Sequence, residues 1–113
     1  MSILDNSHLD MLKEVIGEDL KEILEVFLQT APGELAAIQQ AFDQQDQAGL
    51  RLHSHTLKGS AANVGATGLS LQAKKVEDAV KANDLSSVGE DIQQIEETLS
   101  AVLQALQDYI NKI

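Results

Sequence analysis

Residues 51–65 (RLHSHTLKGSAANVG) combine the side chains that are best suited to chemistry in this sequence. On a helical wheel with about 3.6 residues per turn, His55 points away from the apolar side of this stretch. Lys58 and Gly59 follow His55 within about one turn and lie beside it. A flexible ammonium group at that spacing can screen the charge of an anion carried on the imidazole ring. The spacing therefore indicates an accessible imidazole with a cation next to it.

Gly59 is the least expected of these residues, because glycine in a helix interior costs about 1 kcal/mol relative to alanine. At this position a larger side chain would crowd the imidazole of His55, one turn earlier. Ala62, near the same outward face, is also small. The glycine would leave space for another molecule to reach the ring. The alternative is an ordinary solvated histidine, and the wheel geometry alone leaves both interpretations open.

The other histidines and the acidic pairs are weaker candidates for chemistry. His53 falls at the edge of the core face and is expected to be half-buried without a catalytic role, whereas His8 is expected to be solvated. Because His53 and His55 point in different directions on a helix, they cannot bind one metal ion together. Acidic neighbours such as Glu96 and Glu97 are expected to be solvated in so acidic a chain. No nucleotide-binding or nucleophile-elbow motif occurs, which argues against an autonomous kinase.

Helical periodicity extends through most of the sequence and places these residues on a helix expected over residues 47–64. Its core face is formed by five residues: Leu50, Ser54, Leu57, Ala61 and Val64. From residue 85 to residue 113, apolar residues recur every three or four positions, which predicts one long helix. Asn83 and Asp84 before it are expected to form a turn with an N-cap. A shorter helix is expected between these two, starting after residues 65–68, with its apolar side at Leu69, Ala73, Val76 and Val80.

An amphipathic segment over residues 19–42 is expected to form another long helix. Pro32 predicts a kink or a break near residues 30–31, because proline removes one hydrogen bond and clashes with the preceding turn. Residues 44–47 are expected to form a polar turn before the histidine-bearing helix.

A short first helix is expected to start at Ser7, with Asp10 as its capping partner, and to end at Gly17. Its buried side is expected at Leu9, Leu12, Val15 and Ile16. Together, the helical segments predict an all-α fold: an antiparallel four-helix bundle with a short extra N-terminal helix.

Length and composition set the class of protein. A chain of 113 residues suits a single domain, and its net charge of -10 argues against binding to nucleic acids or docking on an anionic membrane surface. The absence of cysteine excludes disulfides and thiolate chemistry. No apolar stretch approaches the roughly 20 residues that span a bilayer, and the N-terminus lacks the pattern of a secretory signal. We therefore expect a cytoplasmic location.

The motif runs from His55 to Gly59 (HTLKG) and is followed by Gly65 and Ala66. This pattern resembles the signature of histidine-containing phosphotransfer (HPt) domains of bacterial phosphorelays. The surroundings are also similar: a helix containing Phe27 precedes the motif, and two amphipathic helices follow it. The resemblance covers essentially the whole chain, so we expect residues 1–113 to form a single HPt domain.

The resemblance implies that His55 is phosphorylated, that Lys58 stabilises the phosphoryl charge and that Gly59 gives a receiver domain access to the ring. It implies a relay protein without autokinase or phosphatase activity and with no cofactor of its own, because Mg²⁺ is supplied by the receiver. The expected partners are the receiver domains of a hybrid sensor histidine kinase and of a response regulator. Glu77 departs from the pattern, because some family members have glutamine there, hydrogen-bonded to the imidazole. A carboxylate could accept from the ring, but it would repel a phosphoryl group if it pointed inward, so its role stays open.

Exposed apolar residues around His55 are candidates for docking a receiver: Leu52, Ala62 and, on the first helix, Met11. We expect a monomeric, free-standing protein, with a C-terminal part of a hybrid sensor kinase as the alternative. The competing class of function is an acidic helical adaptor or chaperone without chemistry. That class explains the helical pattern and the charge, but not Gly59 beside an outward histidine.

Overall fold

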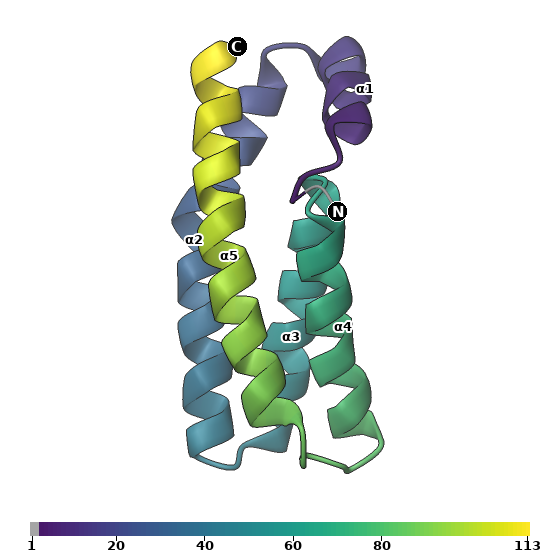
Figure 1. Ribbon diagram of the computed structural model, residues 1–113, viewed down its shortest axis with the longest axis vertical. Helices are drawn as coiled ribbons and strands as arrows, with labels where there is room; N and C mark the ends of the chain where they lie inside the picture. The colour runs from purple at the N-terminus through teal and green to yellow at the C-terminus, as the bar shows by residue number, and fades with distance from the viewer. Residues whose placement is uncertain (1–2) are drawn as a thin grey trace.

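The computed structural model describes residues 3–113, which fold into five helices and, within that range, no strand. They are α1 (Asn6–Ile16), α2 (Asp19–Asp43), α3 (Gln47–Asn63), α4 (Thr67–Lys81) and α5 (Val88–Lys112). The four long helices are antiparallel and pack in the ring order α2, α3, α4, α5, as Figure 1 shows. The fold is all-α, as predicted: an antiparallel four-helix bundle with a short N-terminal helix. None of the helices in the described range is long and apolar enough to cross a membrane.

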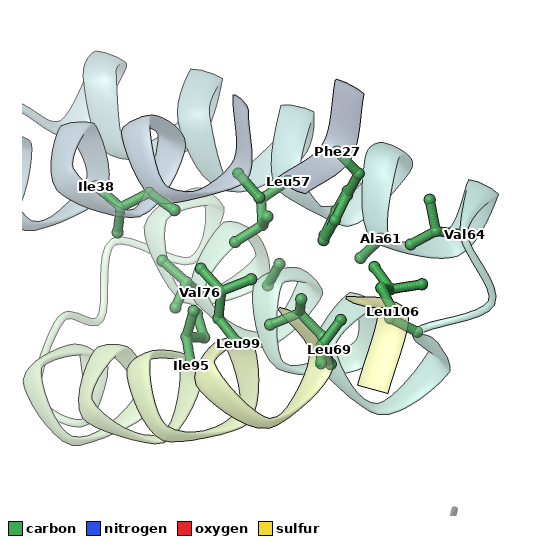
Figure 2. Packing of buried hydrophobic residues seen from close by; sticks show 14 of the residues in the cluster. Phe27, Ile38, Leu57, Ala61, Val64, Leu69, Val76, Ile95, Leu99 and Leu106 are labelled. Atoms are coloured by element: carbon green, nitrogen blue, oxygen red, sulfur yellow. The ribbon is translucent and has the colours of Figure 1, made fainter. Parts of the chain in front are cut away.

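The apolar faces of the helices meet in one core along the bundle axis (Figure 2). The predicted core face of α3 is confirmed, because Leu50, Ser54, Leu57, Ala61 and Val64 are each at most 1% exposed. The apolar stripe of α5 is buried in the same way, with Ile95, Val102 and Leu106 fully covered. This burial fixes the rotation of α3 about its own axis, and it thereby sets the direction in which every other side chain of α3 points.

Helix α1 begins differently from the prediction. Its N-cap is Asp5, whose side chain accepts a hydrogen bond from the backbone N–H of His8 at 3.2 Å, so the predicted cap at Ser7 is wrong. The backbone N–H of Asp5 also donates to the carbonyl of Gly65 at 2.7 Å, which ties the start of α1 to the turn between α3 and α4 (Figure 1). This tie holds Asp5 in the extended conformation that an N-cap requires. Gly17 ends the helix with a positive φ of 60°, as predicted.

The predicted buried side of α1 is only partly correct. Leu9 is buried and Leu12 and Ile16 are half-buried, but Val15 is 75% exposed. Helix α1 covers one end of the bundle rather than joining the ring, so only a narrow stripe of its surface meets the core. Val15 falls outside that stripe.

Helix α2 continues through Pro32, so of the kink or break predicted near residues 30–31, the break does not occur. Proline removes one backbone hydrogen bond, but Phe27, Ala31 and Ile38 bury apolar side chains on both sides of it. The hydroxyl of Thr30 also donates to the carbonyl of Val26 at 2.9 Å. Packing against the core therefore outweighs the loss of a single hydrogen bond.

The start of α5 lies later than predicted. The side chain of Asp84 accepts hydrogen bonds from the backbone N–H and the hydroxyl of Ser86, at 3.2 and 2.7 Å. It closes a local turn instead of capping a helix, and α5 begins at Val88. The Asn83-Asp84 prediction is therefore correct for the turn and wrong for the N-cap.

Candidate functional site

His55 lies in the middle of α3 and points outward, as the wheel predicts, with 64% of its side chain exposed. Ser54 and Leu57 on the opposite side of the helix are fully buried. The start of α3 is capped by Asp46, whose side chain accepts from the backbone N–H of Gly49 at 2.9 Å. A capped helix with a packed face is a rigid support, so the imidazole is presented from a fixed element rather than from a loop.

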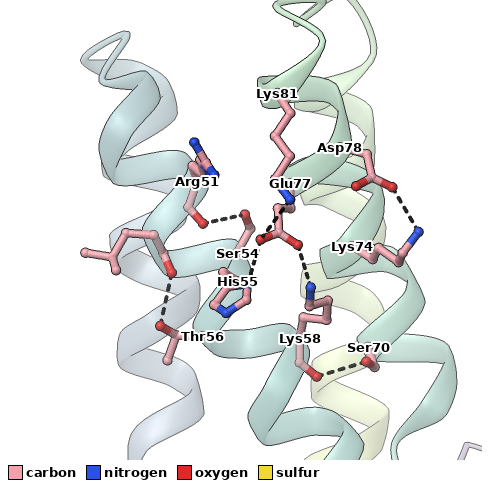
Figure 3. Close-up of polar contacts among 11 residues, drawn as sticks. Arg51, Ser54, His55, Thr56, Lys58, Ser70, Lys74, Glu77, Asp78 and Lys81 are labelled. Atoms are coloured by element: carbon pink, nitrogen blue, oxygen red, sulfur yellow. Dashed lines mark hydrogen bonds and ion pairs between the residues drawn. The ribbon is translucent and has the colours of Figure 1, made fainter.

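Glu77 of α4 lies beside the imidazole and connects it to two lysines (Figure 3). Its Oε2 is 2.6 Å from Nδ1 of His55, and its Oε1 accepts a hydrogen bond from Nζ of Lys58, also at 2.6 Å. Nζ of Lys81, one turn along α4, is 3.8 Å from Oε2. The carboxylate is nearly inaccessible, with 3% of its side chain exposed, because the neighbouring positions Val76 and Val80 face the core.

The hydrogen bond from Lys58 is the main cause that lowers the pKa of Glu77 below its usual value of 4.5. Burial acts in the opposite direction, while the hydrogen bond with His55 and the charges of Lys58 and Lys81 lower the pKa further. The sequence left open whether this carboxylate points inward. It does, and its negative charge is balanced by two ammonium groups rather than left facing the ring alone.

A shallow groove runs between α3 and α4 and has the imidazole in its wall. It is lined by Ala48, Arg51, Leu52, His55, Glu77 and Lys81. Arg51 and Lys81 were not identified from the sequence as part of the site. Lys81 carried a detectable signal, because a lysine four residues after a glutamate on a helix is placed to pair with it. Arg51 carried the same kind of signal, because it lies four residues before His55 and therefore shares a face of α3 with it.

The position of Gly59 is open, as the wheel predicts. A Cβ atom added there would meet nothing within 4 Å beyond its own helix. Lys58 beside it is half-buried, and its backbone carbonyl accepts a hydrogen bond from the hydroxyl of Ser70 at 2.9 Å, which fixes α3 against α4. Beside the imidazole, the surface of α3 is therefore open at Gly59, while the backbone at Lys58 is fixed against α4.

The three residues expected to dock a partner are all exposed. Leu52 is 60% exposed in the wall of the groove, Ala62 is exposed on α3, and Met11 is 54% exposed on α1. Met11 lies near the C-terminal end of α3, because Asp5 and His8 attach α1 there through Gly65 and Asn63. Their role in docking stays a prediction.

The two other histidines make contacts of their own. Nδ1 of His53 is 2.9 Å from Oε2 of Glu34 on α2, and 32% of its side chain is exposed, in agreement with the half-buried position predicted. His8 is not simply solvated, since its Nε2 lies 3.2 Å from the backbone carbonyl of Asn63. Within residues 3–113, no group of three or more histidine or acidic side chains is arranged to hold a metal ion.

Comparison with known proteins agrees with this geometry. The family model of the Hpt domain matches residues 22–105 of the chain. Among solved structures, the chain is similar to histidine-containing phosphotransfer protein B (HptB) from Pseudomonas aeruginosa PAO1, with a TM-score of 0.93 and 24% identity over 98% of this chain and 96% of that one. The HPt domain of a sensor hybrid histidine kinase from Shewanella gives a TM-score of 0.85 with 20% identity, again over 98% and 96% of the two chains.

The histidine-containing phosphotransfer domain of ArcB from Escherichia coli gives a TM-score of 0.80 with 25% identity, over 97% of this chain and 94% of that chain. No curated protein matches the sequence. The structural matches cover the whole bundle, α1 included, whereas the family model begins within α2 and ends within α5.

Proposed function

The chain belongs to the Hpt domain family, and on that basis we propose that it accepts a phosphoryl group on His55 from the aspartate of one receiver domain and passes it to the aspartate of another. One observation supports the assignment to His55 more than any other. Its imidazole is 64% exposed in a groove wall, with Nδ1 engaged by Glu77 and the other ring nitrogen, Nε2, left for an incoming group.

Each neighbour of the ring has a role in this proposal. Lys58 stabilises the charge of the phosphoryl group, and Gly59 leaves room for the receiver's active site to approach. Leu52, Ala62 and Met11 form part of the receiver's docking surface. Phosphoryl transfer requires mainly positioning and charge stabilisation, and a rigid helix with a lysine beside the acceptor supplies both.

The finer features of the function are proposals as well. The partners are the receiver domains of a hybrid sensor histidine kinase and of a response regulator, and residues 1–113 act as one HPt domain in monomeric form in the cytoplasm. The protein has no autokinase or phosphatase activity and no cofactor of its own. The Mg²⁺ ion and the phosphorylated aspartate belong to the receiver.

The test is phosphoryl transfer from purified receiver domains charged with acetyl phosphate and Mg²⁺. We expect at least one receiver to label the protein with phosphate that is labile in acid and stable in base, as expected for a phosphohistidine. Mass spectrometry should place the label on His55. Labelling at another residue would contradict the assignment, and the absence of labelling with every receiver of the same genome would favour the helical adaptor.

A further inference from the structure

A second groove, the α2–α5 groove, lies on the side of the bundle away from His55. The ring order of the helices places α2 and α5 opposite the α3–α4 pair that carries the proposed phosphorylation site (Figure 1). The walls of this groove are residues 32–39 of α2 and residues 96–103 of α5, and its volume is about 260 Å³. Typical small-molecule sites enclose roughly 300–1,000 Å³, so the size favours side chains of a protein partner.

The floor of the α2–α5 groove is apolar and its edges carry small side chains. Leu99 is buried, and Leu35 and Leu103 are half-buried against the core. Ala36 and Ser100 are exposed beside them. Because alanine and serine project little from a helix, the backbone of another helix can approach closely here.

The spacing of the lining residues fits a helix better than an extended chain. In each wall, the first, fourth, fifth and eighth residues of the stretch line the groove, which corresponds to two turns or about 10 Å. A third helix laid along the groove presents anchoring side chains with the same spacing of i, i+3, i+4 and i+7. The described part of the chain contains no strand, so an extended peptide finds no sheet edge with which to pair.

The charge on this side of the molecule has one sign. Residues 22–50 and 82–111, which include nearly all of α2 and α5, contain eleven acidic residues and no lysine or arginine. A second copy of the chain that used the same face would bring acidic residues against acidic residues, and an anionic membrane surface would be repelled. A partner rich in lysine and arginine is attracted instead.

Two carboxylates stand ready for such cations at the edge of the groove. A neighbouring hollow is lined by Gln93, Glu96, Glu97 and Ser100, and it shares Glu96 and Ser100 with the α2–α5 groove. Among the ion pairs of residues 3–113, none involves Glu96 or Glu97. The side-chain amide of Gln39 donates to Glu96 at the long distance of 3.5 Å. Apolar contact and unpaired negative charge therefore lie side by side.

We propose that the α2–α5 groove binds a basic amphipathic helix of a partner protein, whose apolar side chains enter the groove while its lysines and arginines pair with Glu96 and Glu97. This surface is separate from the relay function and does not depend on it. A receiver must bring its aspartate to His55 on the α3–α4 side, so a receiver and the basic helix can bind at the same time.

The first experiment uses a synthetic peptide as the probe. The peptide has about 18 residues, enough for a helix, with leucines at i, i+3, i+4 and i+7 and lysines on both sides of them. A second peptide has the same composition in scrambled order. In ¹⁵N–¹H NMR titrations of the full chain, we expect shifts concentrated in residues 32–39 and 96–103, and binding of the scrambled peptide at least about fivefold weaker. Equal binding of the two peptides, or shifts spread over the whole acidic surface, would overturn the proposal.

Matched variants separate the groove from the net charge. Ser100→Gln fills the groove, whereas Ala101→Gln makes a similar change at an exposed neighbour outside both hollows. We expect Ser100→Gln to raise the Kd of the peptide about tenfold and Ala101→Gln to change it less than about twofold. Glu97→Gln should weaken binding and its dependence on salt, while Glu14→Gln, on α1, changes the net charge equally and should have little effect. Equal effects within either pair would refute the proposal, and circular dichroism checks that each variant is folded.

Other occupants of the groove give different results. A dimer in sedimentation whose dilution shifts the NMR signals of residues 32–39 and 96–103 would assign the groove to a second copy and overturn the proposal. Shifts of the same signals on addition of a receiver would assign it to the receiver, with the same consequence. We expect a phosphorylated receiver to label His55 at an unchanged rate when the peptide is bound. Loss of labelling would contradict simultaneous binding.

Discussion

His53 and His55 are two positions apart and have similar contacts, since Nδ1 of each meets a carboxylate oxygen. They differ in what surrounds that contact. His55 is twice as exposed, at 64% against 32%, and its carboxylate is shared with two lysines. Glu34 has no such partner among the ion pairs of residues 3–113. A phosphoryl dianion on His53 would lie near an unbalanced negative charge, whereas on His55 it would lie near ammonium groups.

Replacing each histidine by glutamine separates these two sites. We expect His55→Gln to abolish labelling by a phosphorylated receiver while the fold survives, because the side chain is exposed and its loss costs about 1 kcal/mol of hydrogen bonding. His53→Gln should keep most of the transfer rate. Labelling with radioactive phosphate and thermal unfolding followed by circular dichroism give the two readouts. Loss of labelling in His53→Gln alone would mean that the acceptor is misassigned.

At the scale of single residues, the sequence predicts directions better than contacts. The outward direction of His55 and the open space at Gly59 follow from the period of one helix, because the buried face of α3 leaves no alternative. The contact of His55 with Glu77 depends on how α3 and α4 are rotated against each other. That rotation is set by side chains across the core, so the role of Glu77 could not be derived from its position in the sequence.

At the scale of the helix, Gly59 lowers the stability of α3, and no packing contact requires a glycine at this position. The space where its Cβ would lie is empty, so no close approach to another helix explains the glycine. Gly33 in α2 is similar in this respect, since a Cβ there also meets nothing within 4 Å. These two helical glycines are unobstructed, one beside His55 and one on a different helix.

Substitution of these glycines by alanine tests whether the space beside His55 matters. We expect Gly59→Ala and Gly33→Ala each to stabilise the protein by about 0.5–1 kcal/mol, which raises Tm by roughly 2–6 °C. Only Gly59→Ala should slow transfer, because its methyl group lies where the receiver approaches, and Gly59→Gln should slow it further. Calorimetry and transfer kinetics give the two measurements. A stabilised Gly59→Ala with an unchanged rate would show that the gap has no functional purpose.

The ion pairs of Glu77 also join α3 to α4, which makes them a source of pH-dependent stability. Because the folded pKa of Glu77 is lowered, its contribution is present above the unfolded pKa of about 4.5 and is lost as the pH falls through the folded value. We expect Glu77→Gln to be less stable by about 1–3 kcal/mol at pH 7, since the two lysines lose the negative charge with which they pair. This difference should shrink below pH 4.5. Urea unfolding between pH 3 and 7 measures it, and a difference independent of pH would contradict the ion-pair explanation.

Helix ends were harder to predict than helix faces. Asp5, rather than Ser7, caps α1 because the preceding backbone is tied to Gly65, 60 positions away in the sequence. Pro32 does not break α2 because apolar residues on both sides of it are held in the core. In both cases, a contact distant in the sequence decides a local outcome, and a local pattern carries no information about such contacts.

At the scale of the whole molecule, the charges are distributed unevenly. The chain carries a net charge of -10, yet three of its eight basic residues lie at His55, namely Arg51, Lys58 and Lys81. A fourth, Lys74, lies one turn before Glu77 on α4 and is paired with Asp78. The remaining surface is strongly acidic. A receiver that presents an acidic active site would be repelled by most of the protein and attracted to the groove between α3 and α4. Such a field raises the rate of productive encounters and falls off over about 8–10 Å at physiological salt.

This asymmetry predicts that association with a receiver depends on salt and on the position of each lysine. We expect Lys74→Glu, near the groove, to slow association about 2–5-fold at low salt and to reduce its dependence on ionic strength. Lys112→Glu makes the same change in net charge at the end of α5, a helix that packs on α2 and α4 rather than on α3, and should have little effect. Stopped-flow binding at several salt concentrations distinguishes the two variants. Equal slowing by both would mean that net charge, and not the basic groove, governs the encounter.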